Sequence, residues 1–221
     1  MCKLDTTYKQ KINGSENMKE IPSTESLDLI FLMDRSGSMG GSESDTIGGF
    51  NSFISREREK SLNTRVTTIL FDDQYEVLYK RKAICEVGEL TRNEYWVRGC
   101  TALLDAIGRT INTLDKEIDN KVLFVIMTDG LENASREFSK EQIRNLIGNH
   151  NWEFVYIGAN IDSYSEAGNI GIRRSRVANY KKSRRGFQDV YSSVSYAADH
   201  LRCNKSLDDS NWNEELKKYD D

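Results

Sequence analysis

The sequence predicts an α/β fold in which helices cover both faces of a mostly parallel sheet. Residues 29–33 form an apolar run without a polar break, and similar runs lie within 121–128 and 153–160. Runs of this kind are typical of strands that are buried on both faces. Segments with apolar residues at helical spacing separate these runs. Strands that alternate with helices in this way indicate a three-layer sandwich.

The first half of the chain supplies the first strand, one helix and a hairpin. Residues 1–25 are polar and end near the only proline, so we expect a loosely ordered lead-in. The first strand is predicted at about 28–34. A helix follows, with Ile47, Phe50, Phe53 and Ile54 on one side. Apolar segments at 66–71 and 75–79 flank the turn residues "DDQ", which predicts a hairpin and therefore one antiparallel strand.

The second half repeats the alternation of helix and strand. A helix is predicted from the spacing of Leu103, Leu104, Ile107, Ile111 and Leu114. The strand at 121–128 comes next, then a helix around 143–147 and the strand at 153–160. An amphipathic helix over 187–201 ends the domain. Residues 203–221 form an acidic tail, which we expect either to fray or to dock through Trp212.

Composition excludes several classes of protein. The net charge of −4 over 221 residues gives no overall reason to expect binding to nucleic acid or membrane. No apolar segment approaches the roughly 18 residues that span a bilayer. The first twenty residues lack the apolar core of a secretory signal, and the four cysteines show no CxxC pair. We therefore expect free thiols and a cytoplasmic location.

Oxygen-bearing side chains follow the apolar runs where the strands end. Asp34 and Asp129 each follow a buried strand, and Ser36 and Ser38 come just after Asp34. Carboxyl ends of parallel strands share one edge of the sheet, so these groups should converge with Thr101, which precedes a predicted helix. Taken alone, Thr101 is more simply an N-cap. Together, the five oxygen groups favour a hard dication such as Mg²⁺, Mn²⁺ or Ca²⁺.

The same residues resemble a known motif. "DRSGS" at 34–38, Thr101 within "GCTALLDAIG" and "TDG" at 128–130 are similar to the metal-ion-dependent adhesion site of the von Willebrand factor A domain family. The resemblance covers about residues 26–202. It implies a Rossmann-like fold with one antiparallel edge strand. The segment "WEFVYIGANIDSYSEAGNIGI" is similar to intracellular bacterial or phage members.

The resemblance also implies roles for the candidate ligands. Ser36 and Ser38 should bind Mg²⁺ directly, as should Thr101 in the ligand-ready state. Asp34 and Asp129 should act directly or through water. A partner protein would then supply an Asp or Glu carboxylate to the remaining position. Helix dipoles and the nearby Arg35 are expected to make this edge of the sheet favourable for that carboxylate.

Enzyme chemistry fits the sequence less well. A phosphate-transferring enzyme of the haloacid-dehalogenase type needs Asp-x-Asp after its first strand, and the second position here is Ser36. The "GSMGGS" segment lacks the lysine of a P-loop. His150 and His200 are interpreted as exposed or capping residues, and Cys100 as a small packed residue. Asp105 is either a support for the site or a favourable charge near a helix start.

One basic segment breaks the acidic average. Residues 173–185, "RRSRVANYKKSRR", contain seven Lys or Arg, no acidic residue, and one tyrosine. A solvated connection before the last helix is the simpler interpretation. Contact with RNA, DNA or an acidic partner protein is the alternative. Two functions therefore stand: a metal-dependent protein-interaction module, and a metal-dependent enzyme or nucleic-acid-associated protein that acts on phosphate esters.

Overall fold

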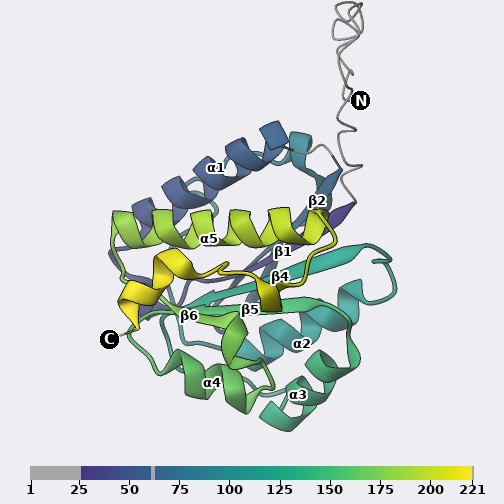
Figure 1. Ribbon diagram of the computed structural model, residues 1–221. Coiled ribbons are helices and arrows are strands. Elements are labelled where there is room, and N and C mark those ends of the chain that lie inside the picture. Colours follow the sequence, from purple (N-terminus) through teal and green to yellow (C-terminus); the bar gives the residue numbers. More distant parts are fainter. Residues whose placement is uncertain (1–25, 61–62, 221) are drawn as a thin grey trace, which may run out of the picture.

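The fold is a three-layer α/β sandwich around a six-stranded sheet (Figure 1). The computed structural model describes residues 26–60 and 63–220, so the expected lead-in at 1–25 lies outside the described residues. The strands are β1 (Leu27–Asp34), β2 (Thr64–Phe71), β3 (Tyr75–Ala83), β4 (Lys121–Thr128), β5 (Glu153–Gly158) and β6 (Val177–Asn179). Their order in the sheet is β3-β2-β1-β4-β5-β6. Only the β2–β3 pair is antiparallel among these, which confirms the predicted fold class and the predicted hairpin at one edge.

Two helices cover one face of the sheet and three cover the other. Figure 1 shows α1 (Glu43–Lys60) and α5 (Arg184–Arg202) side by side above the sheet. Below it lie α2 (Leu103–Leu114), α3 (Lys140–Asn149) and α4 (Ser163–Asn169). Among the described residues, no helix is both long enough and apolar enough to cross a membrane.

Strand β1 shows why the sequence gives this layering. Leu29, Phe31 and Met33 belong to the core beneath α1 and α5, whereas Ile30 and Leu32 belong to the core beneath α2. The Phe31 ring meets Phe50 and Phe53 of α1 edge-on, with centroids 5.7 and 5.2 Å apart. Burying each such side chain contributes roughly 1.5–3 kcal/mol. An unbroken apolar run is therefore what a strand between two helical layers requires.

The basic segment 173–185 contains the sixth strand, so its interpretation as a solvated connection holds only for its exposed basic side chains. Val177 and Ala178 are buried, and β6 pairs with β5 in parallel. Arg176 is only 2% exposed, and its charge is compensated by Glu153 at 2.7 Å and Asp208 at 2.9 Å. The sequence did not predict this strand, because only two apolar residues lie among many positive ones. In the fold, carboxylates from distant segments compensate the charge of Arg176.

The C-terminal segment packs against the outer edge of the sheet. Leu207, Trp212 and Leu216 are each 2% exposed or less and belong to the core beneath α1 and α5. The indole N–H of Trp212 donates to the backbone oxygen of Ser175 at 2.8 Å. Residues 203–220 therefore cover the β6 region and complete this face of the sandwich.

Candidate metal centre

Asp34 lies at the last position of β1 and is 1% exposed. Its Oδ1 accepts the backbone N–H of Ser36 at 2.6 Å, and its Oδ2 accepts the hydroxyl of Thr128 at 2.5 Å. Both donors are neutral. Burial raises the pKa of Asp34 to about 6, although the hydrogen bonds from Thr128 and Ser36 act in the opposite direction. The nearby Asp129 adds a further, smaller upward effect on the same pKa.

Ser36, Ser38 and Asp129 form a continuous chain of oxygen atoms beside Asp34. The two serine hydroxyl oxygens lie 3.0 Å apart, and the Ser38 hydroxyl donates to Asp129 Oδ1 at 2.5 Å. Asp129 follows β4 directly and is 5% exposed. Its other oxygen, Oδ2, is buried and lies 2.7 Å from the ammonium nitrogen of Lys182. This carboxylate oxygen therefore already faces a positive charge, which comes from a distant loop.

Thr101 brings a third hydroxyl to the same place. A Cβ atom built on Gly130 would lie 2.7 Å from Thr101 Oγ1, 3.0 Å from Ser38 Oγ and 3.5 Å from Ser36 Oγ. One point in space therefore lies close to all three hydroxyl oxygens, and Gly130 leaves it free of side-chain atoms. We call residues 34–38, 99–101 and 129–133 the rim.

Thr101 does not cap α2, which corrects the simpler interpretation of this residue. The helix begins at Leu103, and the preceding residue is Ala102. Its free N–H groups are satisfied from the loop after β4: Glu132 Oε2 accepts from Leu104 and Ser135 Oγ accepts from Asp105. Because distant residues fill the capping role, the Thr101 hydroxyl faces the rim instead.

The loop after β4 is fastened to α2 by a second set of contacts. Asp105 accepts the backbone N–H groups of Arg136, Glu137 and Phe138 at 2.9–3.0 Å. Thr101 and Asn133 exchange two hydrogen bonds, of which one uses the Asn133 side chain. These contacts hold the residues that follow Asp129 against the start of α2. Asp105 therefore acts as a support, one of the two roles that the sequence left open.

Arg35 does not give the rim a positive charge, contrary to the expectation from its position. Its side chain is 1% exposed, and its guanidinium pairs with Asp72 at 3.1 Å and with Glu76 at 2.7 Å. The backbone of this loop is also held by the segment at 98–99. The Gly37 N–H donates to the backbone oxygen of Gly99, and the Arg98 N–H donates to the backbone oxygen of Arg35. The hydroxyl of Tyr95 also donates to the backbone oxygen of Asp34 at 2.6 Å.

The donor set of the rim fits a hard dication. Three hydroxyl-bearing residues and Asp129 line an open depression of about 630 Å³, and Asp34 is buried behind them, bonded to the backbone of Ser36. Oxygen donors of this kind suit Mg²⁺, Mn²⁺ or Ca²⁺. In the described part of the chain, no three His, Cys, Asp or Glu side chains gather as a metal-binding group. That result agrees with a candidate set in which hydroxyls outnumber carboxylates.

Several supporting residues were not among the candidates from the sequence. Thr128, Glu132, Asn133 and Lys182 each contact a candidate ligand or fix its loop. Thr128 lies within the "TDG" segment and could have been found there. Lys182 belongs to the basic segment, and nothing in its local sequence indicates that it reaches the rim.

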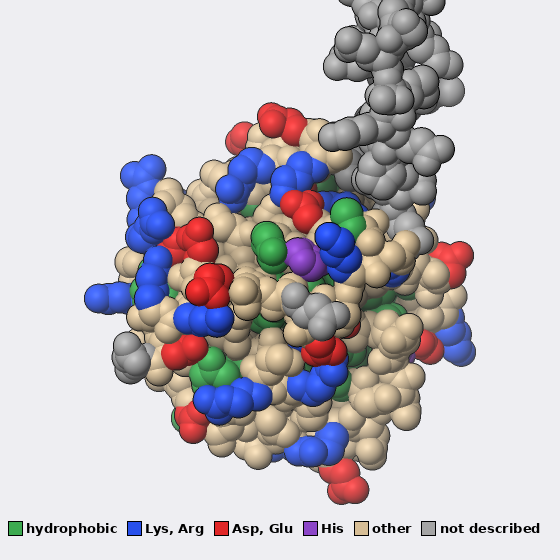
Figure 2. All heavy atoms as spheres, viewed as in Figure 1, with side chains coloured by type: hydrophobic (Ala, Val, Ile, Leu, Met, Phe, Trp, Pro, Cys, Tyr) green, Lys and Arg blue, Asp and Glu red, His purple; other side chains and the backbone are tan. Residues whose placement is uncertain are grey.

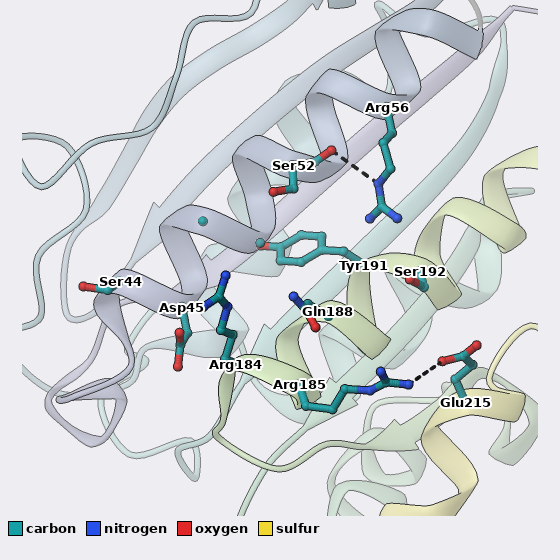
Figure 3. A pocket seen from close by; sticks show the side chains of 12 residues that line it. Ser44, Asp45, Ser52, Arg56, Arg184, Arg185, Gln188, Tyr191, Ser192 and Glu215 are labelled. Atoms are coloured by element: carbon teal, nitrogen blue, oxygen red, sulfur yellow. Dashed lines mark hydrogen bonds and ion pairs between the residues drawn. The ribbon is translucent and has the colours of Figure 1, made fainter.

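The remaining basic residues of segment 173–185 lie elsewhere and mostly have partners. Arg173 and Arg176 pair with Asp208, and Arg185 pairs with Asp189. Arg184 and Arg185 line a polar groove of about 780 Å³ between α1 and α5 (Figure 3). Figure 2 shows basic side chains gathered at the edge near the N-terminal ends of these two helices, with acidic side chains among them. The mixed signs give no continuous basic surface on that face.

Comparison with known proteins identifies the fold. No protein-family model matches this chain, and no curated protein matches it. Proximal thread matrix protein 1 from the mussel byssus superposes with a TM-score of 0.61 at 18% identity, over 80% of this chain and 47% of that protein. The von Willebrand factor type A structure from Catenulispora acidiphila gives 0.56 at 12% identity, over 79% and 43%.

A third structure is the manganese-loaded TRAP protein from Plasmodium vivax, with a TM-score of 0.52 at 19% identity, over 72% of this chain and 70% of that one. The chain spans less than half the length of the first two structures. At these identities the likeness concerns the fold, and the fold of this chain is that of a von Willebrand factor A domain.

Proposed function

We propose that this protein is a divalent-metal-dependent interaction module that binds a carboxylate of a partner protein. Ser36, Ser38 and Thr101 would hold the metal through their hydroxyl oxygens, and Asp34 and Asp129 would act directly or through water. Mg²⁺ is the expected ion, with Mn²⁺ and Ca²⁺ as alternatives. The manganese in the Plasmodium structure agrees with a divalent ion in a domain of this fold. The scattered cysteines of the sequence favour a cytoplasmic setting.

The observation that carries this proposal is the convergence of three hydroxyl oxygens on one point beside Gly130. Hydroxyl groups from two separate loops have no structural need to face the same small volume, because each could bond to backbone or water. Asp129 lies at the same rim with a single lysine as its counter-charge, and Asp34 is buried with neutral donors alone. A dication compensates both carboxylates.

A bound dication would supply a Lewis-acidic position that accepts a carboxylate oxygen. The chain's own contribution is to shape the approach to that position. The depression is open to solvent, and Leu131, 55% exposed, lies on its lining. An exposed leucine beside a charged centre would contact apolar side chains that neighbour the acidic residue on the surface of a partner protein. We propose binding at this position and no catalysis.

The test uses Gly130→Ala, which keeps all five candidate ligands. The added methyl would lie within 2.7 Å of Thr101 Oγ1, so it should occupy the metal position. Gly148→Ala is the matched control, since a Cβ there meets nothing within 4 Å. Mg²⁺ or Mn²⁺ should raise the melting temperature of the wild type and of Gly148→Ala, because a ligand of the folded state stabilises it. A full metal response in Gly130→Ala would rule out this site.

Partner binding is tested in the same variants. Immobilised wild-type protein should capture a partner in Mg²⁺ and release it in chelator, and Gly130→Ala should capture none. Replacing one Asp or Glu of that partner with its amide should abolish capture. The alternative function predicts another outcome: metal-dependent hydrolysis of a phosphate ester by the wild type that is absent from Gly130→Ala.

A further inference from the structure

Lys182 is the basic residue of segment 173–185 that reaches the rim. It lies in the loop between β6 and α5, and its side chain is 23% exposed. Its ammonium group donates to the backbone oxygen of Ser38 at 2.7 Å and lies 2.7 Å from Asp129 Oδ2. One side chain from a distant loop therefore contacts two of the loops that carry the candidate ligands.

The placement of this lysine has an electrostatic consequence for cation binding. Asp129 is one of two carboxylates at the rim, and its side chain is fully buried beside Lys182. A lysine ammonium is a compact point charge on a flexible stem, so it can move without unfolding its loop. While it stays on Asp129, it cancels part of the negative charge that attracts a dication and repels that dication at short range.

We propose that Lys182 is a further functional residue of the rim, a tethered cation that competes with the divalent metal for Asp129 and weakens metal binding. This inference rests on the proposed metal site. When the metal binds, the ammonium leaves Asp129 and becomes more accessible to solvent. The metal affinity of the protein then depends on how much more strongly Asp129 interacts with the metal than with the ammonium group. Every lysine modification that removes the charge at position 182 therefore strengthens metal binding.

The experiment measures Mg²⁺ and Mn²⁺ affinity by calorimetry in the full chain. Lys182→Met removes the charge and keeps the apolar stem, and we expect it to bind metal about tenfold more tightly than the wild type, the scale of one partly buried ion pair. Lys182→Arg keeps the charge and should bind metal as weakly as the wild type. Lys181→Met is the matched control, because it removes the same positive charge from the neighbouring residue, whose side chain is exposed.

The outcomes separate this inference from the proposed function. A Lys182→Met affinity equal to or below that of Lys181→Met would overturn the role of Lys182, because a residue that positions Asp129 would lose affinity on removal. Absence of metal binding in the wild type and in every variant would overturn the metal site itself. A measurement on the wild type alone gives a second check: acetylation of Lys182, read by mass spectrometry, should become faster with Mg²⁺ while that of Lys181 stays the same. An unchanged rate at Lys182 would overturn the inference.

Discussion

Two buried aspartates at the same edge of the sheet are compensated in different ways. Asp34 ends β1 and Asp72 directly follows β2, the neighbouring parallel strand. Their exposed fractions are 1% and 0%. Asp72 Oδ2 lies 3.1 Å from Arg35 Nε and 2.6 Å from Arg98 Nε. Asp34 receives hydrogen bonds from a hydroxyl and a backbone amide, and neither donor carries a charge.

Under the proposed function, this difference assigns Asp72 to structure and Asp34 to binding. A buried carboxylate is costly unless a charge or several donors compensate it. Two guanidinium groups fix Asp72 permanently and fasten the loop at 98–101 to the hairpin. Asp34 has no such partner among the described residues, and burial of its carboxylate raises its pKa to about 6. An external cation could remove that cost, so the uncompensated aspartate is the one suited to binding.

The largest effect is expected at the structural aspartate. Asp72→Asn should destabilise the protein by about 3 kcal/mol, because it leaves the buried Arg35 with only the half-exposed Glu76 as a counter-charge. Urea unfolding followed by circular dichroism measures this change. The exposed neighbour gives the control, and Asp73→Asn should stay within about 0.5 kcal/mol of the wild type. A loss below 1 kcal/mol at Asp72 would contradict the comparison.

The opposite sign is expected at the rim. Without metal at pH 7.5, Asp34→Asn should leave stability unchanged or raise it, by up to about 3 kcal/mol, since one unit of pKa is worth about 1.4 kcal/mol. The amide keeps the shape of the side chain and carries no buried charge. The same variant should lose the stabilisation by Mg²⁺. If Asp34→Asn were as destabilising as Asp72→Asn, then Asp34 would be structural too.

The pH dependence sharpens this contrast. The pKa of Asp34 is about 6 in the folded protein and near 3.8 in the unfolded chain, so the folded state holds the proton more tightly. The contribution of Asp34 to metal-free stability is therefore fully present below about pH 4 and is lost as pH rises to about 6. Urea unfolding in chelator should show the wild type losing stability relative to Asp34→Asn across this window. Mg²⁺ affinity should change the other way and weaken below pH 6, because protons compete with the metal.

Much of this arrangement follows from the sequence. The apolar runs of β1, β4 and β5 required burial on two faces, and parallel strands then bring their carboxyl ends to one edge. That rule predicted that Asp34, Ser36, Ser38 and Asp129 lie near one another, and the resemblance to a known motif added Thr101. The hairpin at 66–79 was equally visible, because its turn residues lie between two apolar segments. These features depend on local pattern and on a general rule of topology.

What the sequence could not predict depends on contacts between distant residues. Thr101 is not the N-cap of α2, because Glu132 and Ser135 accept the backbone N–H groups at the start of that helix. The charge of Arg35 is compensated by Asp72 and Glu76, which lie 37 and 41 residues further along the chain. Lys182 and Ser38 are 144 residues apart in sequence. No local pattern records such pairings, and each of them alters the electrostatics of the rim.

The smallest expected effect separates the two arginines that compensate Asp72. Arg98 is 28% exposed and Arg35 is 1% exposed, although Arg98 has the shorter contact with Asp72. Water screens the exposed pair, so Arg98→Gln should cost only about 1 kcal/mol, whereas an equivalent change at Arg35 should cost several-fold more. Urea unfolding of the two variants compares them directly. Because Asp34 makes no ion pair with either arginine in the described structure, Arg98→Gln should keep the full rise in melting temperature with Mg²⁺. A loss of that response would mean that the two aspartates are coupled through the loop at 98–101, and the contrast between them would then be one of degree.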